Sequence, residues 1–159
     1  MLDGWSKTYA MTGWRLGYAV WPDALVEHAT RLAINCHSCV NAPTQWAGKA
    51  ALDGPQDEAD AMIKAFDERR RVIVDELNKV DGFRCAEPGG AFYAFPNIEG
   101  TGMSARAMQD GLLEKAGVAI IAGTSFGAMG EGYVRFSYAN STENIIRAIA
   151  RVREFLAAR

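Results

Sequence analysis

Near its start the chain reads Gly4-Trp5-Ser6-Lys7-Thr8-Tyr9-Ala10-Met11-Thr12-Gly13-Trp14-Arg15-Leu16-Gly17. The glycines on both sides favour a turn, with one lysine and one arginine a few residues apart. A lysine acts as a covalent catalyst when its amine bonds to a carbonyl carbon. An arginine suits a planar phosphate contact made through two hydrogen bonds. Together, Lys7 and Arg15 indicate a lysine that binds a phosphorylated aldehyde cofactor.

The length and composition predict an ordinary globular protein. The chain has 159 residues, of which 49% are hydrophobic and 23% are charged. This length favours one domain, with room for a small appendage. The net charge of -2 gives no basic face for nucleic acid, and no apolar run is long enough to span a membrane. The three cysteines, without an export signal at the N-terminus, predict reduced thiols and a cytoplasmic location.

The first half of the sequence is mainly helical in pattern. An aromatic and β-branched run at 14–21 predicts a strand that ends at Pro22. Apolar spacing then predicts three helices, over 23–36, 44–52 and 56–80. The first of these helices is expected to place Leu25, Ala29, Leu32 and Ala33 on one face.

The second half alternates between short strands and helices. The expected strands are 83–85, 91–95, 118–121 and 132–138, and the expected helices are 104–116 and one that begins after Ser141 as its cap. The first two strands are predicted to be joined through Pro88-Gly89-Gly90, and Leu113 is predicted to face inward. Short turns between strands indicate an α+β fold, with helices on one face of a small sheet. The first 22 residues fit this plan poorly.

Four ordered stretches resemble motifs of the class I/II aminotransferases, the fold-type I pyridoxal phosphate enzymes, and most closely the bacterial aspartate/aromatic branch. They are the lysine stretch Ser6–Tyr18, Pro88-Gly89-Gly90-Ala91-Phe92-Tyr93, Ala122-Gly123-Thr124-Ser125-Phe126-Gly127, and Tyr133-Val134-Arg135-Phe136-Ser137-Tyr138-Ala139. Each motif alone would be suggestive, whereas four in order across the chain make a specific signal.

The resemblance implies the fold and the domains. Residues 23–159 would form the small C-terminal aminotransferase domain, with helices packed on a small, mainly antiparallel sheet. Residues 1–22 would be a remnant hairpin of the large cofactor-binding domain. In the family the lysine lies a little past the middle of the chain. We therefore expect this sequence to be a C-terminal portion without the N-terminal half, including the groups that contact the cofactor ring.

The resemblance also implies the site residues. Lys7 would be the catalytic residue, binding pyridoxal 5'-phosphate covalently and moving a proton at the substrate Cα. Arg15 would hold the cofactor phosphate, and Ser6 is assigned to the cofactor as well. Arg135 would bind the substrate α-carboxylate through two hydrogen bonds. Phe126 would line the substrate pocket or serve as a hydrophobic anchor.

This sequence departs from the family at several positions. Gly4 stands where many relatives have a hydroxyl residue for the phosphate, and Ala122 replaces a proline. Dicarboxylate-specific members of one branch place an arginine in the segment that corresponds to 37–43, where this chain has none. The sequence therefore argues against aspartate as the specific substrate. Cys36 and Cys39 have a metal-like spacing, but no second ligand pair exists, so we expect no metal site.

The predicted function is pyridoxal phosphate-dependent transamination between an amino acid and a 2-oxo acid. We expect the isolated chain to be inactive or very weakly active. We also expect a homodimer, formed through residues 1–22 or the adjacent helix, and no nucleic acid or membrane partner. The alternatives are a non-catalytic aminotransferase-like structural or interaction module, and a fragment of a related enzyme such as a β-elimination lyase.

Overall fold

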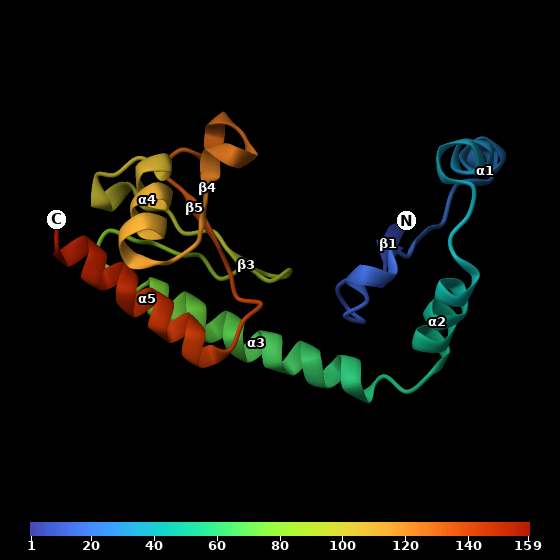
Figure 1. The fold of residues 1–159 in the computed structure, drawn as a ribbon, viewed down its shortest axis with the longest axis horizontal. Helices are drawn as coiled ribbons and strands as arrows, with labels where there is room; N and C mark the ends of the chain where they lie inside the picture. Colours follow the sequence, from blue (N-terminus) through green and yellow to red (C-terminus); the bar gives the residue numbers. More distant parts are fainter. The chain divides into compact units, whose positions relative to one another are not determined.

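The computed structural model describes all residues 1–159, and the chain divides into two compact units. Unit 1 comprises Met1–Ile63 and unit 2 comprises Lys64–Arg159. Figure 1 labels the helices and strands of both units. The boundary falls within helix α3 (Asp57–Leu77). The predicted assignment of 1–22 and 23–159 to a large and a small domain concerns a longer protein and stays a prediction.

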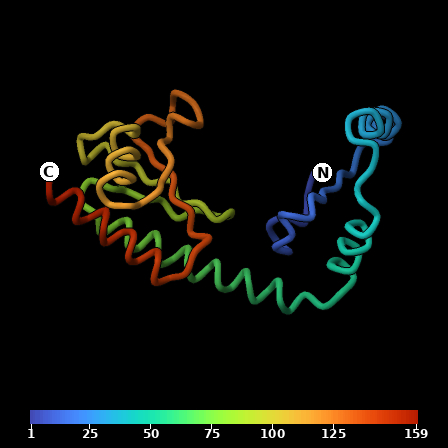
Figure 2. The backbone as a smooth tube through the Cα atoms, in the orientation of Figure 1, coloured from blue at the N-terminus to red at the C-terminus, as the bar shows by residue number.

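Unit 1 consists of a short hairpin followed by two helices. Its elements are β1 (Leu2–Gly4), β2 (Gly17–Ala19), α1 (Asp23–His37) and α2 (Ala42–Asp53). The two strands pair antiparallel, with Leu2 opposite Ala19 and Gly4 opposite Gly17. Asn41 caps α2 by accepting a hydrogen bond from the Thr44 N–H, as a polar N-cap residue does. The path of the backbone through the hairpin and both helices can be followed in Figure 2.

The sequence predicted the elements of unit 1 well but misjudged two details. The strand is shorter than expected, because the backbone forms a 3₁₀ turn at Thr12–Trp14 and becomes extended only at Gly17. The helix over 23–36 is confirmed as α1, but none of its residues is buried. Leu25 and Leu32, predicted to share one apolar face of this helix, are 46% and 65% exposed, because no other element of unit 1 covers them.

Unit 2 is a three-stranded antiparallel sheet packed with helices. Its strands are β3 (Tyr93–Ala94), β4 (Ile121–Ala122) and β5 (Val134–Ser137), and its helices after α3 are α4 (Ala105–Gly111) and α5 (Thr142–Ala157). The strand order is β3-β5-β4, so β5 is central. Helices α3 and α5 run side by side, and Arg153 of α5 reaches Glu76 of α3 at 2.9 Å (Figure 1). Unit 2 confirms the predicted α+β class.

The core of unit 2 is apolar and continuous. Its fully buried members come from every element of the unit and include Ile73, Leu77, Ile98, Met108, Leu112, Val134, Tyr138, Ile149 and Val152. Ser141 caps α5 as predicted, because its side chain accepts a hydrogen bond from the Asn144 N–H. No helix of the chain is long and apolar enough to cross a membrane.

Three predictions for unit 2 are corrected. Residues 83–85 form only a single bridge, Arg84 to Asn97, and not a strand. Within 118–121 only Ile121 joins a strand, β4. Leu113 is 54% exposed, because α4 continues into a π-helical turn at Leu112–Ala116. A π-turn takes more residues than an α-turn, so it changes the face to which the following side chains point.

Candidate functional site

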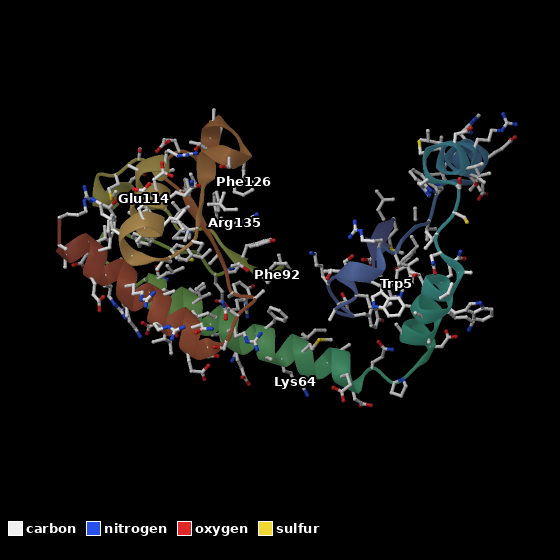
Figure 3. The ribbon with its side chains drawn as sticks, in the orientation of Figure 1. Trp5, Lys64, Phe92, Glu114, Phe126 and Arg135 are labelled. Atoms are coloured by element: carbon white, nitrogen blue, oxygen red, sulfur yellow. The ribbon has the colours of Figure 1, made fainter.

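The lysine motif forms a turn that Trp5 anchors to the core of unit 1. Trp5 is 7% exposed, and its indole Nε1–H donates a hydrogen bond to the Gly48 carbonyl oxygen at 2.9 Å. Figure 3 shows the indole pointing toward α2. The turn spans Trp5–Tyr9, with Ser6 half-buried and Lys7 exposed. The lysine therefore lies on the surface two residues after a fixed aromatic side chain.

Gly48 allows α2 to approach the lysine hairpin closely. A Cβ atom at this position would lie 2.3 Å from Leu16 Cδ2 and 3.2 Å from Trp5 Cε2. On the other side of the turn, the Tyr9 hydroxyl donates a hydrogen bond to Gln56 Oε1 at 3.0 Å. The turn that holds Ser6 and Lys7 is thus fixed by a small cluster of side chains, and any larger residue at position 48 would disturb it.

The predicted strand over 14–21 would include Arg15, but this residue lies just before β2 and outside any strand. It follows the 3₁₀ turn with φ 56° and ψ 50°, a left-handed conformation that is uncommon for a residue with a side chain. Its Nη1 donates a hydrogen bond to the Thr12 carbonyl oxygen at 3.1 Å. Unusual backbone conformations of this kind are frequent at ligand-binding sites, where the surrounding structure maintains them.

Arg15 lines a surface cleft of about 1010 Å³ within unit 1. The cleft lies between the segments 10–17 and 37–44, and its other lining residues include Trp14, His37, Cys39, Asn41 and Thr44. It contains no acidic side chain, so the Arg15 guanidinium is its one charged group when His37 is neutral. A cleft of this kind favours an anionic ligand. Lys7 is not among its lining residues.

Arg135 lies on the central strand β5, between two aromatic rings. Its guanidinium carbon is 4.2 Å from the ring centre of Tyr93 and 4.7 Å from that of Phe126. Its neighbours Val134 and Phe136 are buried on the opposite face, as the alternation of side chains along a strand requires. Figure 3 shows Phe126 and Arg135 close together at the edge of unit 2. Both rings make cation–π contacts with the guanidinium.

The aromatic surface around Arg135 extends beyond these two rings. Phe95 meets Phe126 edge to face, with ring centres 6.1 Å apart, and stacks on Tyr133 with centres 5.4 Å apart. Phe95 and Phe126 are 41% and 55% exposed. Arg135 forms no ion pair with an acidic side chain in unit 2, so its guanidinium edge is available to a carboxylate.

Two loops position the aromatic rings at Arg135. At the start of the loop with Phe126, Gly123 and Gly130 touch through their backbones, and a Cβ atom at Gly123 would lie 2.1 Å from the Gly130 oxygen. The loop before Tyr93 contains Ala91, whose φ of 60° is left-handed. The Tyr138 hydroxyl donates a hydrogen bond to the Ala91 carbonyl oxygen at 2.9 Å. Burial raises the pKa of Tyr138, so its hydroxyl keeps its proton and remains a donor.

The structure therefore joins three of the four sequence motifs at one place. Tyr93, Phe126 and Arg135 come from three separate motifs and meet in unit 2. Ser6, Lys7 and Arg15 belong to unit 1. The sequence reasoning did not identify Tyr93 as a contact of Arg135. Tyr93 pairs with Ser137, two residues from Arg135 on the same face of the sheet, and this register could not be read from the sequence.

No group of three histidine, cysteine, aspartate or glutamate side chains is arranged to hold a metal ion. Cys36 and Cys39 are exposed at the end of α1, and Cys85 is buried in unit 2. Burial raises the pKa of the Cys85 thiol, which keeps this cysteine in its protonated form.

Comparison with known proteins identifies the family. A family model for aminotransferase class I and II matches residues 1–152. The chain is 45% identical to the aspartate aminotransferase of Pyrococcus horikoshii over 98% of its own length, and 40% identical to that of Geobacillus stearothermophilus. Among solved structures, the aromatic aminotransferase from P. horikoshii matches 99% of this chain with a TM-score of 0.94 and 36% identity. The aspartate aminotransferase from Rhizobium meliloti matches with a TM-score of 0.92 and 34% identity.

These relatives are longer than this chain. The chain spans 40% of the length of the P. horikoshii aspartate aminotransferase and 43% of the solved aromatic aminotransferase chain. Coverage of this extent agrees with the predicted C-terminal portion. The prediction from the four motifs is therefore confirmed, and the chain belongs to the aminotransferase class I and II family.

Proposed function

We propose that this chain supplies part of the active site for a pyridoxal phosphate-dependent transamination between an amino acid and a 2-oxo acid. Family membership supports the reaction class, and the arrangement around Arg135 is the single observation that supports the role of this chain in it. A guanidinium held between Tyr93 and Phe126, without an acidic partner, suits the carboxylate that amino acids and 2-oxo acids share.

The residues of unit 1 suit the aldehyde and the phosphate group of the cofactor. Lys7 is an exposed amine on a turn, able to bond to an aldehyde. Arg15 lies in a cleft free of acidic side chains, which favours a phosphate, and Ser6 lies next to the lysine. When bound, pyridoxal phosphate would act as an electron sink for the substrate Cα. The proposed roles of these residues follow from the family resemblance together with this local chemistry.

The chain's own groups would then bind, orient and move a proton. Arg135 would hold the substrate α-carboxylate through two parallel hydrogen bonds, which fixes the direction of the Cα–H bond. Tyr93 and Phe126 would keep the guanidinium plane in place and exclude water from its faces. Lys7, in its neutral form, would take the proton from the substrate Cα and return it in the later step.

A trapping experiment tests the proposed role of Lys7. The purified chain is mixed with pyridoxal phosphate and reduced with borohydride, and the labelled lysines are identified by peptide mass spectrometry. We expect one preferred label at Lys7, lost in Lys7→Ala and retained in Lys115→Ala, which removes another exposed lysine. Arg15→Gln should raise the concentration of cofactor needed for half labelling.

The opposite results are equally clear. Equal labelling of the wild-type chain and the Lys7→Ala variant would show only nonspecific reaction with surface amines. The chain would then fit the alternative of a non-catalytic module. We expect weak binding and no efficient turnover by the chain alone.

We further propose that the chain self-associates through α1, as expected for a homodimer. The helix has no buried residue, and Leu25, Val26, Leu32 and Ile34 are 45–65% exposed. Leu25 and Leu32, seven residues apart, lie on one face of α1, and exposed apolar side chains on one face are typical of protein interfaces. Sedimentation should show a concentration-dependent dimer that Leu32→Glu weakens. A monomer at all concentrations would exclude this surface as a self-association site.

A further inference from the structure

A separate pocket of about 390 Å³ lies in unit 2, and Arg135 is not among its lining residues. The buried side chains of Val118, Phe136 and Ile145 form its apolar floor. Its polar lining consists of Ser137, Asn140, Asn144, Arg147 and Arg151. No aspartate or glutamate lines the pocket, so its charged groups are both positive.

One of these cations is held in place by a chain of hydrogen bonds. Arg147 Nη2 donates to Asn144 Oδ1 at 2.6 Å, and Asn144 Nδ2 donates to Asn140 Oδ1 at 2.8 Å. Asn140 Oδ1 also accepts a bond from the Ser141 N–H at 2.8 Å. Asn140 Oδ1 thereby accepts two hydrogen bonds from within the protein, and Asn144 Oδ1 accepts one. The N–H groups of the Arg147 guanidinium and of Asn140 Nδ2 that make no bond in this network are donors available to a ligand.

The second cation, Arg151, makes no hydrogen bond or ion pair and lies next to Gly117. Its Nη1 lies 3.5 Å from the position that a Cβ atom would take at Gly117. Gly117 has a φ of +63°, which favours glycine, and it ends the π-helical turn. At this distance a Cβ atom would be in ordinary van der Waals contact with the guanidinium, which lies beside the end of the π-helical turn.

The two cations differ from most other arginines on the helices of unit 2. Arg70, Arg71, Arg106 and Arg153 each contact an acidic side chain at 2.6–2.9 Å. Arg147 and Arg151 form no such pair, although Glu143 and Glu154 lie on the same helix. One helical turn separates the two, which places both on one face of α5.

We propose that this pocket binds a small organic anion, held by Arg147 and Arg151 through a carboxylate or phosphate group. A guanidinium binds either group through paired hydrogen bonds. Two guanidiniums one turn apart suit a ligand with two negative charges, and the floor of Val118, Phe136 and Ile145 suits a short carbon chain. This inference does not depend on the proposed transamination, because none of the lining residues belongs to that site.

Titration of the whole chain tests the proposal. Succinate and inorganic phosphate are added separately, and binding is followed by calorimetry and by NMR of the arginine side chains. We expect saturable binding of at least one of them, weakened about tenfold or more in Arg147→Gln/Arg151→Gln, as for the loss of charge-assisted hydrogen bonds. The control is Arg71→Gln/Arg106→Gln, which also removes two positive charges, at exposed arginines of α3 and α4 outside the pocket.

Both outcomes of the titration are informative. Tighter binding of succinate would identify a dicarboxylate ligand, and tighter binding of phosphate would identify a phosphate ester; either supports the proposal. Absence of saturable binding, or an equal loss in the control variant, would overturn it. Circular dichroism of each variant establishes that it is folded. Asn144→Ala, which removes the hydrogen bonds to Arg147 and Asn140 but keeps both positive charges, should weaken binding less than the double variant.

Discussion

The two units of this chain have different interiors. Unit 2 has a continuous core that draws on every one of its helices and strands. Unit 1 has few buried side chains, namely those of Trp5, Leu16, Thr44 and Ala59. Gly48, also buried, lies between α2 and the hairpin, and α1 contributes no buried residue. The groups proposed to hold the cofactor thus lie on the unit with the smaller core. The proposed carboxylate-binding arginine lies on a central strand of the larger one.

Aromatic residues are divided between the two units in a way that makes the comparison measurable. All four tryptophans, Trp5, Trp14, Trp21 and Trp46, belong to unit 1. All seven phenylalanines belong to unit 2. Tryptophan fluorescence therefore reports on unit 1 alone, whereas the far-ultraviolet circular dichroism of the helices reports on both units.

The largest effect is expected from a cavity in the core of unit 2. Leu77 is fully buried, so Leu77→Ala should lower the free energy of unfolding by about 2–5 kcal/mol. In urea, the circular dichroism transition should shift to lower denaturant while the fluorescence transition shifts less. The matched control is Leu32→Ala in unit 1, where the side chain is 65% exposed and the change should stay within about 0.5 kcal/mol.

This comparison fails if the two probes give one transition that moves as a whole. Coincident transitions in the wild-type chain and an equal shift of both in Leu77→Ala would mean that the two units unfold as a single cooperative body. The small core of unit 1 would then be stabilised by unit 2, and the contrast between the two interiors would have no thermodynamic consequence.

Several features of unit 2 could be predicted from sequence because the local signals agreed. In α5 the cap at Ser141 and the apolar spacing of Ile145, Ile149 and Val152 point to the same helix, and all three side chains are buried. The exposure of Arg135 relative to Val134 and Phe136 followed from alternation along a strand. In both cases the short-period pattern of apolar residues along one helix or strand was enough to predict which side chains are buried.

The errors arose where side chains or backbone turns replaced regular pairing. Asn78 bonds to both backbone groups of Cys85, donating to its oxygen at 3.0 Å and accepting from its N–H at 2.8 Å, so no strand is needed there. Arg15 takes a left-handed conformation that no propensity assigns to arginine. The convergence of Tyr93 and Phe126 on Arg135 depends on strand order, which short-range patterns do not determine.

An intermediate loss of stability is expected when alanine replaces a glycine at which two backbone segments, or a backbone and a side chain, lie in close contact. In Gly123→Ala the added methyl group would meet the Gly130 backbone oxygen, which has little freedom to move. We expect a loss of about 1–3 kcal/mol, together with displacement of Phe126 from Arg135. In Gly48→Ala the nearest atom is the end of the Leu16 side chain, which can rotate away, so the loss should be smaller and confined to the fluorescence of unit 1.

Unfolding in urea measures both glycine variants, and the arginine side-chain NMR signal of Arg135 reports the loss of its aromatic neighbour. A larger loss in Gly48→Ala than in Gly123→Ala would contradict the distinction between rigid backbone and flexible side-chain neighbours. It would also show that the lysine turn is held more firmly than the small core of unit 1 suggests.

The smallest effect concerns a pair of helices within unit 2. Glu76 of α3 contacts Lys79 and Arg153, and the hydrogen bond from Lys79 is the main reason why the pKa of Glu76 lies below its ordinary value of 4.5. A lowered pKa in the folded state stabilises the protein above the unfolded pKa, and this contribution is lost as the pH falls through the folded value. Because Lys79 and Arg153 are 61% and 37% exposed, solvent screens both ion pairs of Glu76, and we expect them to contribute about 1 kcal/mol or less to stability.

Glu76→Gln should therefore lower the free energy of unfolding slightly at pH 7 and have almost no effect near pH 3. Urea titrations at both pH values measure the difference, and a variant effect of equal size at pH 3 and pH 7 would show that packing, and not charge, joins α3 to α5.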